Sequence, residues 1–300
     1  EEALDFQAAR RVAQALGTRH HEYFVTARDY WRAVPDYMAH FESLMAGGVF
    51  HIQGGVAFHL LSRRIAQNVK VAFSGEGADE LFGGYNRYIW TSRIWKRIGW
   101  LPVGLRNLAA KGIRSISPST WAGAIRAAGG ISPVARNFPN AGDKVYKFAS
   151  ILNARNPEEI YLDLISQWKI PDEVIIDGHE PVTILTGQAG QLGSGSITDR
   201  MMFLDLVTYL PDDILVKVDR ASMLNSLEVR VPMLDHVFAE LTFRIPDQLK
   251  LRDGERKYVL RRAMASHLPE CVLSHRKQGF AVPLESWFRE DLLAYAAECF

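Results

Sequence analysis

Apolar residues in the first 73 positions alternate between the spacing of helices and that of strands. An opening run that steps by three or four residues and stops at Gly17 predicts a helix. Its members are Leu4, Ala8, Val12, Ala15 and Leu16. Residues 21–25 predict a short strand, and the apolar run at residues 69–73, broken only by Lys70, predicts a buried strand.

Two further helices are predicted between these strands. Thr26, with Asp29 three residues later, predicts a capped helix start. The apolar face of this helix keeps a regular spacing through Tyr30, Val34, Tyr37, Phe41 and Leu44. After a loop at Gly47 and Gly48, a second helix carries Val56, Leu60, Leu61 and Ile65. The resulting order of elements is typical of a parallel sheet with right-handed crossovers.

Beyond Tyr85 the strand patterns fade and helical ones predominate. Asn156 and Pro157 predict a helix start, with Ile160, Tyr161, Leu164, Ile165 and Trp168 behind it. Residues 198–210 and 256–267 predict further helices, and the glycine- and serine-rich residues 187–196 predict a mobile loop. We therefore predict one partial α/β domain over residues 1–300. It comprises a partial parallel-sheet core over about residues 1–90 and a mostly helical remainder over about residues 91–300.

The composition is typical of an ordinary soluble globular protein. Of 300 residues, 48% are hydrophobic and 23% are charged, and the formal net charge is +1. No apolar run reaches the roughly 18 residues that a membrane-spanning helix needs. Cys271 and Cys299 provide neither a disulfide framework nor a metal-ligand spacing. We therefore expect a cytoplasmic protein with no membrane partner.

Basic residues are concentrated between positions 81 and 142, where the chain has no aspartate or glutamate. They are Arg87, Arg93, Lys96, Arg97, Arg106, Lys111, Arg114, Arg126 and Arg136. One interpretation is a surface for nucleic acid or a membrane. The other is a solvated basic face, or a wall near an anionic ligand. We favour the second and expect no nucleic-acid partner, because the residues lack helical alignment and RNA-binding aromatic motifs.

The chemistry is concentrated in the segment Ser-Gly-Glu-Gly-Ala-Asp-Glu-Leu-Phe-Gly-Gly-Tyr at residues 74–85. It begins where the strand predicted at residues 69–73 ends, and parallel sheets bind ligands at the carboxyl ends of their strands. Ser74, Gly75 and Gly77 allow a backbone to come close to a ligand.

Carboxylates follow directly in the same segment. Helix capping explains part of the acidity of Glu76, Asp79 and Glu80. Capping requires neither glycine on both sides of Glu76 nor the Gly83-Gly84 pair. A carboxylate at a glycine-flanked strand end is suited to holding Mg²⁺ or to acting as a base.

Residues 74–85 resemble the signature of the asparagine synthetase (glutamine-hydrolysing) family. Three further stretches match that family in the same order, at residues 209–235, 257–261 and 277–287. The likeness covers nearly the whole chain and is weakest over about residues 94–153. It implies an adenine nucleotide alpha hydrolase-like core with an α/β/α arrangement.

The resemblance also implies a reaction and its partners. Aspartate would be amidated to asparagine with ATP and Mg²⁺, through a β-aspartyl-adenylate. Ammonia would come from glutamine, supplied by an N-terminal glutaminase domain, and the family is compatible with a homodimer. By resemblance, Ser74, Gly75 and Gly77 bind the nucleotide and Asp79 holds the metal. Glu76 and Lys257 are the implied catalytic residues, Lys257 by stabilising charge on the phosphates.

Several of these residues also allow structural interpretations. Lys257 could be an exposed helix lysine, and Asp212, Asp213 and Lys217 could be surface charges or loop caps. Glu228 and Arg230 could pair with each other or line the site. His20 and His21 are expected to be strand-edge residues, since no cysteine or histidine lies at metal-ligand spacing from them.

The sequence departs from the family in two places. The family's Ser-Gly-Gly-x-Asp-Ser loop, which grips pyrophosphate, is not found and would lie just upstream of Glu1, so we expect the 300-residue chain alone to be inactive. Residues 42–55 differ from the family's proline- and serine-containing stretch beside the substrate. An acceptor other than aspartate, such as a peptide or a β-lactam precursor, therefore stays open. A non-catalytic nucleotide-binding or scaffold module is the alternative of another class.

Overall fold

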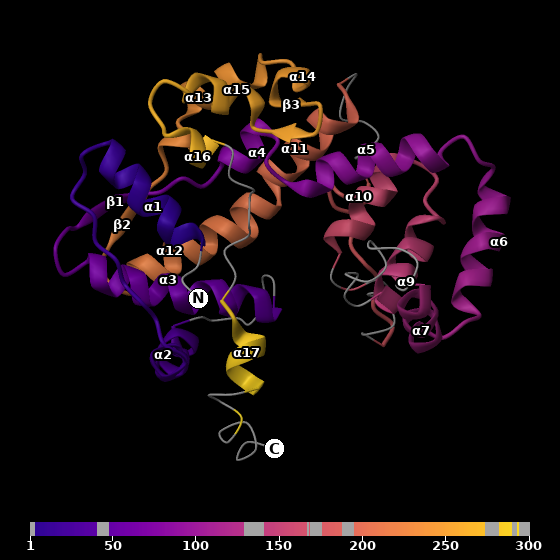
Figure 1. Ribbon diagram of the computed structural model, residues 1–300, viewed down its shortest axis with the longest axis horizontal. Coiled ribbons are helices and arrows are strands. Elements are labelled where there is room, and N and C mark those ends of the chain that lie inside the picture. The colour runs from indigo at the N-terminus through magenta and orange to yellow at the C-terminus, as the bar shows by residue number, and fades with distance from the viewer. Residues whose placement is uncertain are drawn as a thin grey trace. The chain divides into compact units, whose positions relative to one another are not determined.

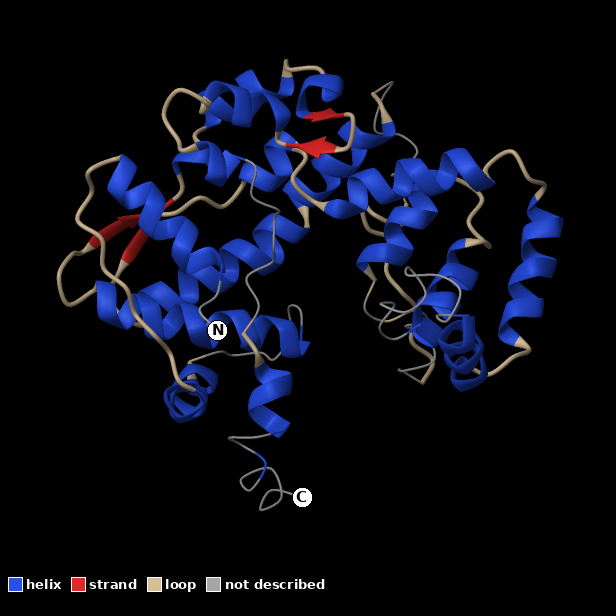
Figure 2. Cartoon of the chain, in the orientation of Figure 1, coloured by secondary structure: helices blue, strands red, loops and turns tan. Residues whose placement is uncertain are grey.

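The structure is a computed structural model that describes residues 4–40, 48–128, 141–166, 168, 176–187, 195–273, 282–289 and 293. The chain forms two compact units. Unit 1 combines Glu1–Gly84 with Asp205–Phe300, and unit 2 consists of Tyr85–Leu204. Figure 1 labels the elements, and Figure 2 shows that helices predominate. None of the described helices is both long and apolar enough to cross a lipid bilayer.

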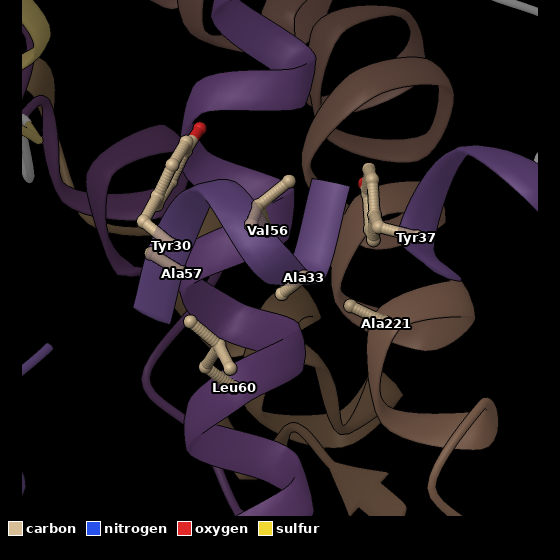
Figure 3. Close-up of a cluster of buried hydrophobic side chains, with 7 residues drawn as sticks. All are labelled: Tyr30, Ala33, Tyr37, Val56, Ala57, Leu60 and Ala221. Atoms are coloured by element: carbon tan, nitrogen blue, oxygen red, sulfur yellow. The ribbon is translucent and has the colours of Figure 1, made fainter. Parts of the chain in front are cut away.

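The main core of unit 1 lies between helices that are far apart in the sequence. α1 (Leu4–Ala15), α2 (Ala27–Ala39) and α3 (Gly48–Ile65) come first, and α12 (Val216–Met223) packs against α3. The buried core residues, drawn in Figure 3, are Tyr30, Ala33, Tyr37, Val56, Ala57, Leu60 and Ala221. The helices predicted before residue 69 are therefore confirmed, except that Gly48, predicted to lie in a loop, begins α3; Phe41, Leu44 and Gly47 lie outside the described residues.

The start of α2 has the predicted cap. The Thr26 hydroxyl accepts a hydrogen bond from the Asp29 amide at 3.1 Å, and the Asp29 carboxylate accepts one from the Thr26 amide at 3.2 Å. Two otherwise unpaired amides at the helix start are satisfied in this way, which stabilises such a start by about 1 kcal/mol.

A small parallel sheet connects the two sequence segments of unit 1. β1 (Val71–Phe73) pairs in parallel with β2 (Glu228–Arg230), so that Val71 lies opposite Glu228 and Phe73 opposite Arg230. The predicted α/β class is confirmed. The prediction that this strand is buried is wrong: Val71 is 39% and Phe73 is 75% exposed. Among the described residues β1 and β2 pair only with each other, so the outer edge of each strand has no strand partner there, and the face that carries Val71 and Phe73 is exposed.

The strand predicted at residues 21–25 is absent, and the segment is an extended loop. Side-chain contacts hold this segment in place of the backbone hydrogen bonds to a neighbouring strand that a β-strand would make. Glu22 accepts hydrogen bonds from Nε and Nη2 of Arg10 at 2.5 and 2.7 Å, and Phe24 stacks on Phe6 with ring centroids 4.7 Å apart. His20 also contacts the Glu22 carboxylate, at 3.0 Å. Contacts to α1 therefore account for the extended conformation of the segment that was predicted to be a strand.

The second half of unit 1 is a series of short elements. They are η3 (Leu210–Leu215, a π-helix), α12, β2, η4 (Pro232–Leu234), α13 (His236–Phe243), α14 (Asp247–Lys250), β3 (Leu251–Arg252), β4 (Glu255–Arg256), α15 (Tyr258–Ala263), α16 (Glu270–Leu273) and α17 (Leu284–Arg289). β3 and β4 form an antiparallel hairpin. The helix predicted at residues 256–267 is shorter than expected, because Arg256 belongs to this hairpin and α15 ends at Ala263.

All the regular elements in the described part of unit 2 are helices. It contains α5 (Asn86–Ile98), α6 (Val103–Arg114), α7 (Pro118–Ala128), α9 (Ala141–Ile151), α10 (Pro157–Ile165) and most of α11 (Ile197–Val207). Asn156 caps α10 as predicted, because its side-chain oxygen accepts a hydrogen bond from the Glu159 amide at 2.8 Å. Trp168 lies beyond α10 and is 64% exposed, so it is not part of that helix's buried face. The loop predicted at residues 187–196 lies mostly outside the described residues.

The core of unit 2 includes one of the nine basic residues. Its buried residues are Ile98, Ala110, Ala149, Ile151, Leu152, Ala154 and Ile160. The buried Arg106 guanidinium donates hydrogen bonds to the Leu101 carbonyl at 3.1 Å, to the Leu152 carbonyl at 3.2 Å and to the Ala154 carbonyl. Arg106 therefore satisfies backbone carbonyl groups at the ends of neighbouring segments and is not part of the protein surface.

Candidate active site

The candidate site begins where β1 ends. The Ser74 amide donates a hydrogen bond to the Arg230 carbonyl at 2.9 Å, so Ser74 continues the pairing of β1 with β2 by one residue. A Cβ placed on Gly75 would meet nothing within 4 Å, which leaves the backbone at this position open to a ligand. Gly77 has a φ of +83° and a Cβ there would lie 2.4 Å from Leu234 of η4. The loop from Ser74 to Gly77 is thus packed against Leu234 at Gly77 and open to a ligand at Gly75.

Glu76 lies in this loop with one carboxylate oxygen buried. Its Oε2 has no hydrogen-bond partner among the described residues. A buried carboxylate oxygen that lacks a donor destabilises a folded protein, because the water it gave up is not replaced. Such a group is expected where a ligand supplies the missing partner. The observation supports a functional role for Glu76 over a purely structural one.

Asp79 and Lys257 form an ion pair next to this loop. Nζ of Lys257 lies 3.1 Å from Oδ1 of Asp79, and the two side chains are 23% and 22% exposed. Asp79 is on α4 (Ala78–Phe82) and Lys257 directly precedes α15. The structure therefore brings together two predicted site residues from opposite ends of the sequence, and Lys257 is not an isolated surface lysine.

The two adjacent glycines after α4 determine this contact. Gly83, with a φ of +69°, ends the helix, and a Cβ there would lie 2.9 Å from Leu251 of β3. A Cβ on Gly84 would lie 1.7 Å from Oδ1 of Asp79 and 2.5 Å from Cε of Lys257. Gly84 thus provides the space that the ion pair occupies. This accounts for the Gly83-Gly84 pair, which helix capping alone did not explain.

The β3–β4 hairpin positions Lys257. Its two-residue turn has Asp253 at a φ of +51° and Gly254 at +86°, the conformation in which both central residues are left-handed. Lys257 itself has a φ of +54°. A left-handed conformation costs a residue with a side chain roughly 1–3 kcal/mol and is found most often where function requires it.

A second polar cluster lies around Gly54 and Gly55 of α3. Lys217 of α12 pairs with Asp213 at 3.7 Å, and a Cβ on Gly54 would lie 3.5 Å from the Lys217 Cδ. A Cβ on Gly55 would lie 1.8 Å from the Tyr37 hydroxyl oxygen. The two glycines therefore let side chains from α2 and α12 approach the α3 backbone. Burial raises the pKa of Tyr37 well above its ordinary value, so its hydroxyl stays protonated at neutral pH.

Of the other charged residues considered in the sequence, Glu228 and Arg230 form an ion pair with each other. Nε of Arg230 lies 2.7 Å from Oε1 of Glu228, and both side chains are more than half exposed. Asp212 is exposed, unlike the half-buried Asp213. Exposed pairs such as Glu228 with Arg230 contribute little to stability.

The residues at the start of α4 fit a magnesium ion that arrives with a nucleotide. No group of three or more histidine, cysteine, aspartate or glutamate side chains that could hold a metal occurs in the described part of the chain. Nucleotide-bound Mg²⁺ needs only one or two protein carboxylates, because phosphates and water complete its coordination. The Asp79 carboxylate, in the first turn of α4, meets that requirement.

Comparison with known proteins gives consistent similarity to one family. A family model described as asparagine synthase matches residues 1–300. "Asparagine synthetase [glutamine-hydrolyzing] 1" of Bacillus subtilis is 30% identical over 292 residues, which cover 96% of this chain and 42% of that protein. A "Putative asparagine synthetase [glutamine-hydrolyzing]" of Mycobacterium tuberculosis is 31% identical over 294 residues, covering 97% and 41%. A Saccharomyces cerevisiae asparagine synthetase is 45% identical over 84 residues, covering 28% and 14%. The chain spans about two fifths of the length of the two bacterial relatives.

Proposed function

Because this chain belongs to the asparagine synthase family, we propose that it provides the ATP-dependent synthetase site of an enzyme that amidates aspartate. The observation that carries the proposal is the ion pair of Asp79 and Lys257, held against Gly84; Glu76, whose buried oxygen has no donor among the described residues, stands three positions before Asp79 in the chain. A scaffold that only binds a partner has no use for this combination. The cation, the carboxylates and the open glycine backbone are the groups that phosphoryl chemistry needs.

The proposed reaction has two steps. An oxygen of the aspartate side-chain carboxylate attacks the α-phosphorus of ATP, and the bond to the β-phosphate breaks to release pyrophosphate. Ammonia then attacks the acyl carbon of the β-aspartyl-adenylate, and AMP leaves as asparagine forms. Ammonia would come from glutamine, as the names of the relatives indicate for those proteins.

In the first step, negative charge increases on the leaving pyrophosphate. Lys257 is proposed to stabilise that charge, since a fixed cation in a water-poor site lowers the barrier more than one in bulk water. The Asp79 carboxylate, 3.1 Å from Nζ of Lys257, would hold Mg²⁺ beside the same phosphates. Bound magnesium would neutralise phosphate charge and orient the polyphosphate.

The remaining residues of the loop are proposed to position the nucleotide and the acyl group. Ser74, Gly75 and Gly77 would bind the nucleotide through a backbone that Gly75 leaves uncovered. Glu76 would lie beside the activated carboxylate, where its buried oxygen can accept a hydrogen bond from the substrate. A different carboxylic acid is the second candidate acceptor. The glycines at positions 54 and 55, in the stretch that departs from the family pattern, are the observation in its favour.

The test is aspartate-dependent exchange between ATP and labelled pyrophosphate, measured on the natural full-length protein. Glu76→Ala and Lys257→Ala should each lower the exchange rate by about a hundredfold or more, as the loss of a positioned electrostatic group does. Glutamine hydrolysis should be unchanged, and Lys96→Ala, at an exposed lysine of α5, serves as the matched control. Exchange near the wild-type rate in Lys257→Ala would refute the assignment. Exchange with other carboxylic acids but not with aspartate would establish the second candidate.

A further inference from the structure

The outward face of α6 in unit 2 is apolar and uncovered. Leu105 and Leu108 are 59% and 68% exposed, and Trp100, just before the helix, is 75% exposed. Residues three apart on a helix are neighbours, so the two leucines form one continuous surface. Adjacent to them on the same face are Gly104, Ala109 and Gly112, which are also exposed. We call Leu105, Leu108, Ala109 and the two glycines the α6 outer face.

Gly104 and Gly112 lie on the exposed side of α6, where a glycine destabilises the helix and no neighbouring side chain requires one. A Cβ added to Gly104 or Gly112 would meet nothing within 4 Å. Gly104 and Gly112 stand near the two ends of α6, where a glycine costs less than the roughly 1 kcal/mol relative to alanine that it costs in a helix interior. The described residues therefore give no packing requirement for either glycine, although a small residue does allow another helix to approach closely.

Exposed positive charge is frequent in this part of unit 2. Six basic side chains of α5, α6 and α7 are exposed, and none has an acidic partner among the described residues: Arg93, Lys96, Arg97, Lys111, Arg114 and Arg126. Lys111 lies three residues from Leu108, on the edge of the α6 outer face. The whole segment from residue 81 to 142 contains no acid. An apolar strip with a lysine at its edge and no acid in the surrounding segment is complementary to an apolar strip beside negative charge.

We propose that the α6 outer face is a docking site for an acidic amphipathic helix of a partner protein. Its leucines would cover the partner's apolar face, and Gly104 and Gly112 would let the two helix backbones approach. Aspartate and glutamate beside the partner's apolar stripe would pair with Lys111. The proposal is independent of the synthetase site, because all these residues belong to unit 2.

Three other occupants fit less well. A second copy of this chain would bring the same excess of cations against itself. Nucleic acid is bound mainly through hydrogen bonds to phosphate, which leucine, alanine and glycine side chains cannot make. Binding to an anionic membrane scales with buried apolar area, and the glycines and Ala109 contribute little to it.

The experiment selects binders from a displayed library of 20-residue peptides. Each peptide has leucine at helical three- and four-residue spacing and all other positions random, and the immobilised 300-residue chain is the target. Selected peptides are then measured by fluorescence anisotropy. We expect enrichment of peptides with a net negative charge. Leu108→Asp should weaken their binding at least about tenfold, and Lys111→Glu should weaken it and reduce its salt dependence.

The matched control is Leu241→Asp on α13, where the leucine is 55% exposed on unit 1. It should leave peptide binding unchanged, and circular dichroism should show that both variants are folded, because both side chains are exposed. Enrichment of neutral or basic peptides, or binding that Leu108→Asp does not weaken, overturns the proposal. So does Leu108-dependent self-association, measured by sedimentation, or Leu108-dependent binding to phosphatidylserine vesicles.

Discussion

Substitution of Gly84 by alanine should reduce the activity of the site more than it reduces the stability of the fold. The new Cβ would lie 1.7 Å from Oδ1 of Asp79, whereas ordinary contacts begin at 3.4 Å. The carboxylate must therefore withdraw by about 1.7 Å, and Lys257, whose Cε would lie 2.5 Å from the same Cβ, must move as well. The ion pair at 3.1 Å cannot survive both displacements.

The expected cost differs strongly between stability and activity. Asp79 and Lys257 are each more than a fifth exposed, so loss of their pair should reduce the free energy of unfolding by about 1 kcal/mol or less. Loss of a positioned cation and carboxylate should lower pyrophosphate exchange about a hundredfold, which corresponds to about 2.7 kcal/mol of transition-state stabilisation. The activity loss should thus exceed the stability loss.

Three measurements test this reasoning. Urea unfolding of the 300-residue chain gives the stability term, and pyrophosphate exchange by the full-length protein gives the activity term. Gly123→Ala on α7, where an added Cβ meets nothing within 4 Å, is the matched control. The double variant Gly84→Ala with Lys257→Ala should lose less than the product of the two single losses, because both changes displace or remove the Lys257 cation. Additive losses, or exchange within twofold of wild type in Gly84→Ala, would show that Gly84 does not act through the pair.

Two further predictions concern buried titratable groups of unit 1. Burial lowers the pKa of His59 below its ordinary 6.5, and its Nδ1 lies 2.9 Å from the Asn225 side-chain amide nitrogen, a donor. Below about pH 6.5 the unfolded chain therefore binds a proton at this position more readily than the folded chain does, so the free energy of unfolding should decrease as the pH is lowered. His59→Gln should flatten this pH dependence in urea unfolding, and His267→Gln should not. Burial raises the pKa of Tyr30 from 10 to about 12, so stability should fall between pH 10 and 12 as the unfolded chain loses the proton first. Tyr30→Phe should reduce that alkaline loss and Tyr23→Phe, at an exposed tyrosine, should not; an equal loss in both variants would contradict the assignment.

Local signals in the sequence predicted the parts of the fold that depend on local interactions. The caps at Thr26 and Asn156 and the apolar spacing of α2 and α3 were identified correctly because each depends on residues within a few turns. The strand predicted at residues 21–25 was wrong, since a short apolar segment does not show whether a strand partner exists. The run at residues 69–73 was correctly predicted to contain a strand. The prediction that this strand is buried was wrong, because burial depends on how many strands flank it.

The candidate site was only partly accessible from the sequence. Glycines and carboxylates at a strand end drew attention to Ser74, Glu76 and Asp79, but their contact with Lys257 depends on pairing between distant segments. β2 was missed because a three-residue strand carrying Glu228 and Arg230 has no apolar run. The β3–β4 hairpin could have been found, since Asp253-Gly254 is a strong signal for a two-residue turn.

The division of the chain has a consequence for its synthesis on the ribosome. Residues of unit 2 leave the ribosome as a continuous block, whereas unit 1 needs α12, β2 and the β3–β4 hairpin, all encoded after that block. Until then β1 emerges without β2, and α3 without α12. A nascent chain stalled before residue 205 should therefore contain a folded helical block behind a protease-sensitive N-terminal segment. The vulnerable interval for aggregation is the time taken to translate unit 2, when Val56 and Leu60 of α3 still lack Ala221, their core neighbour from α12.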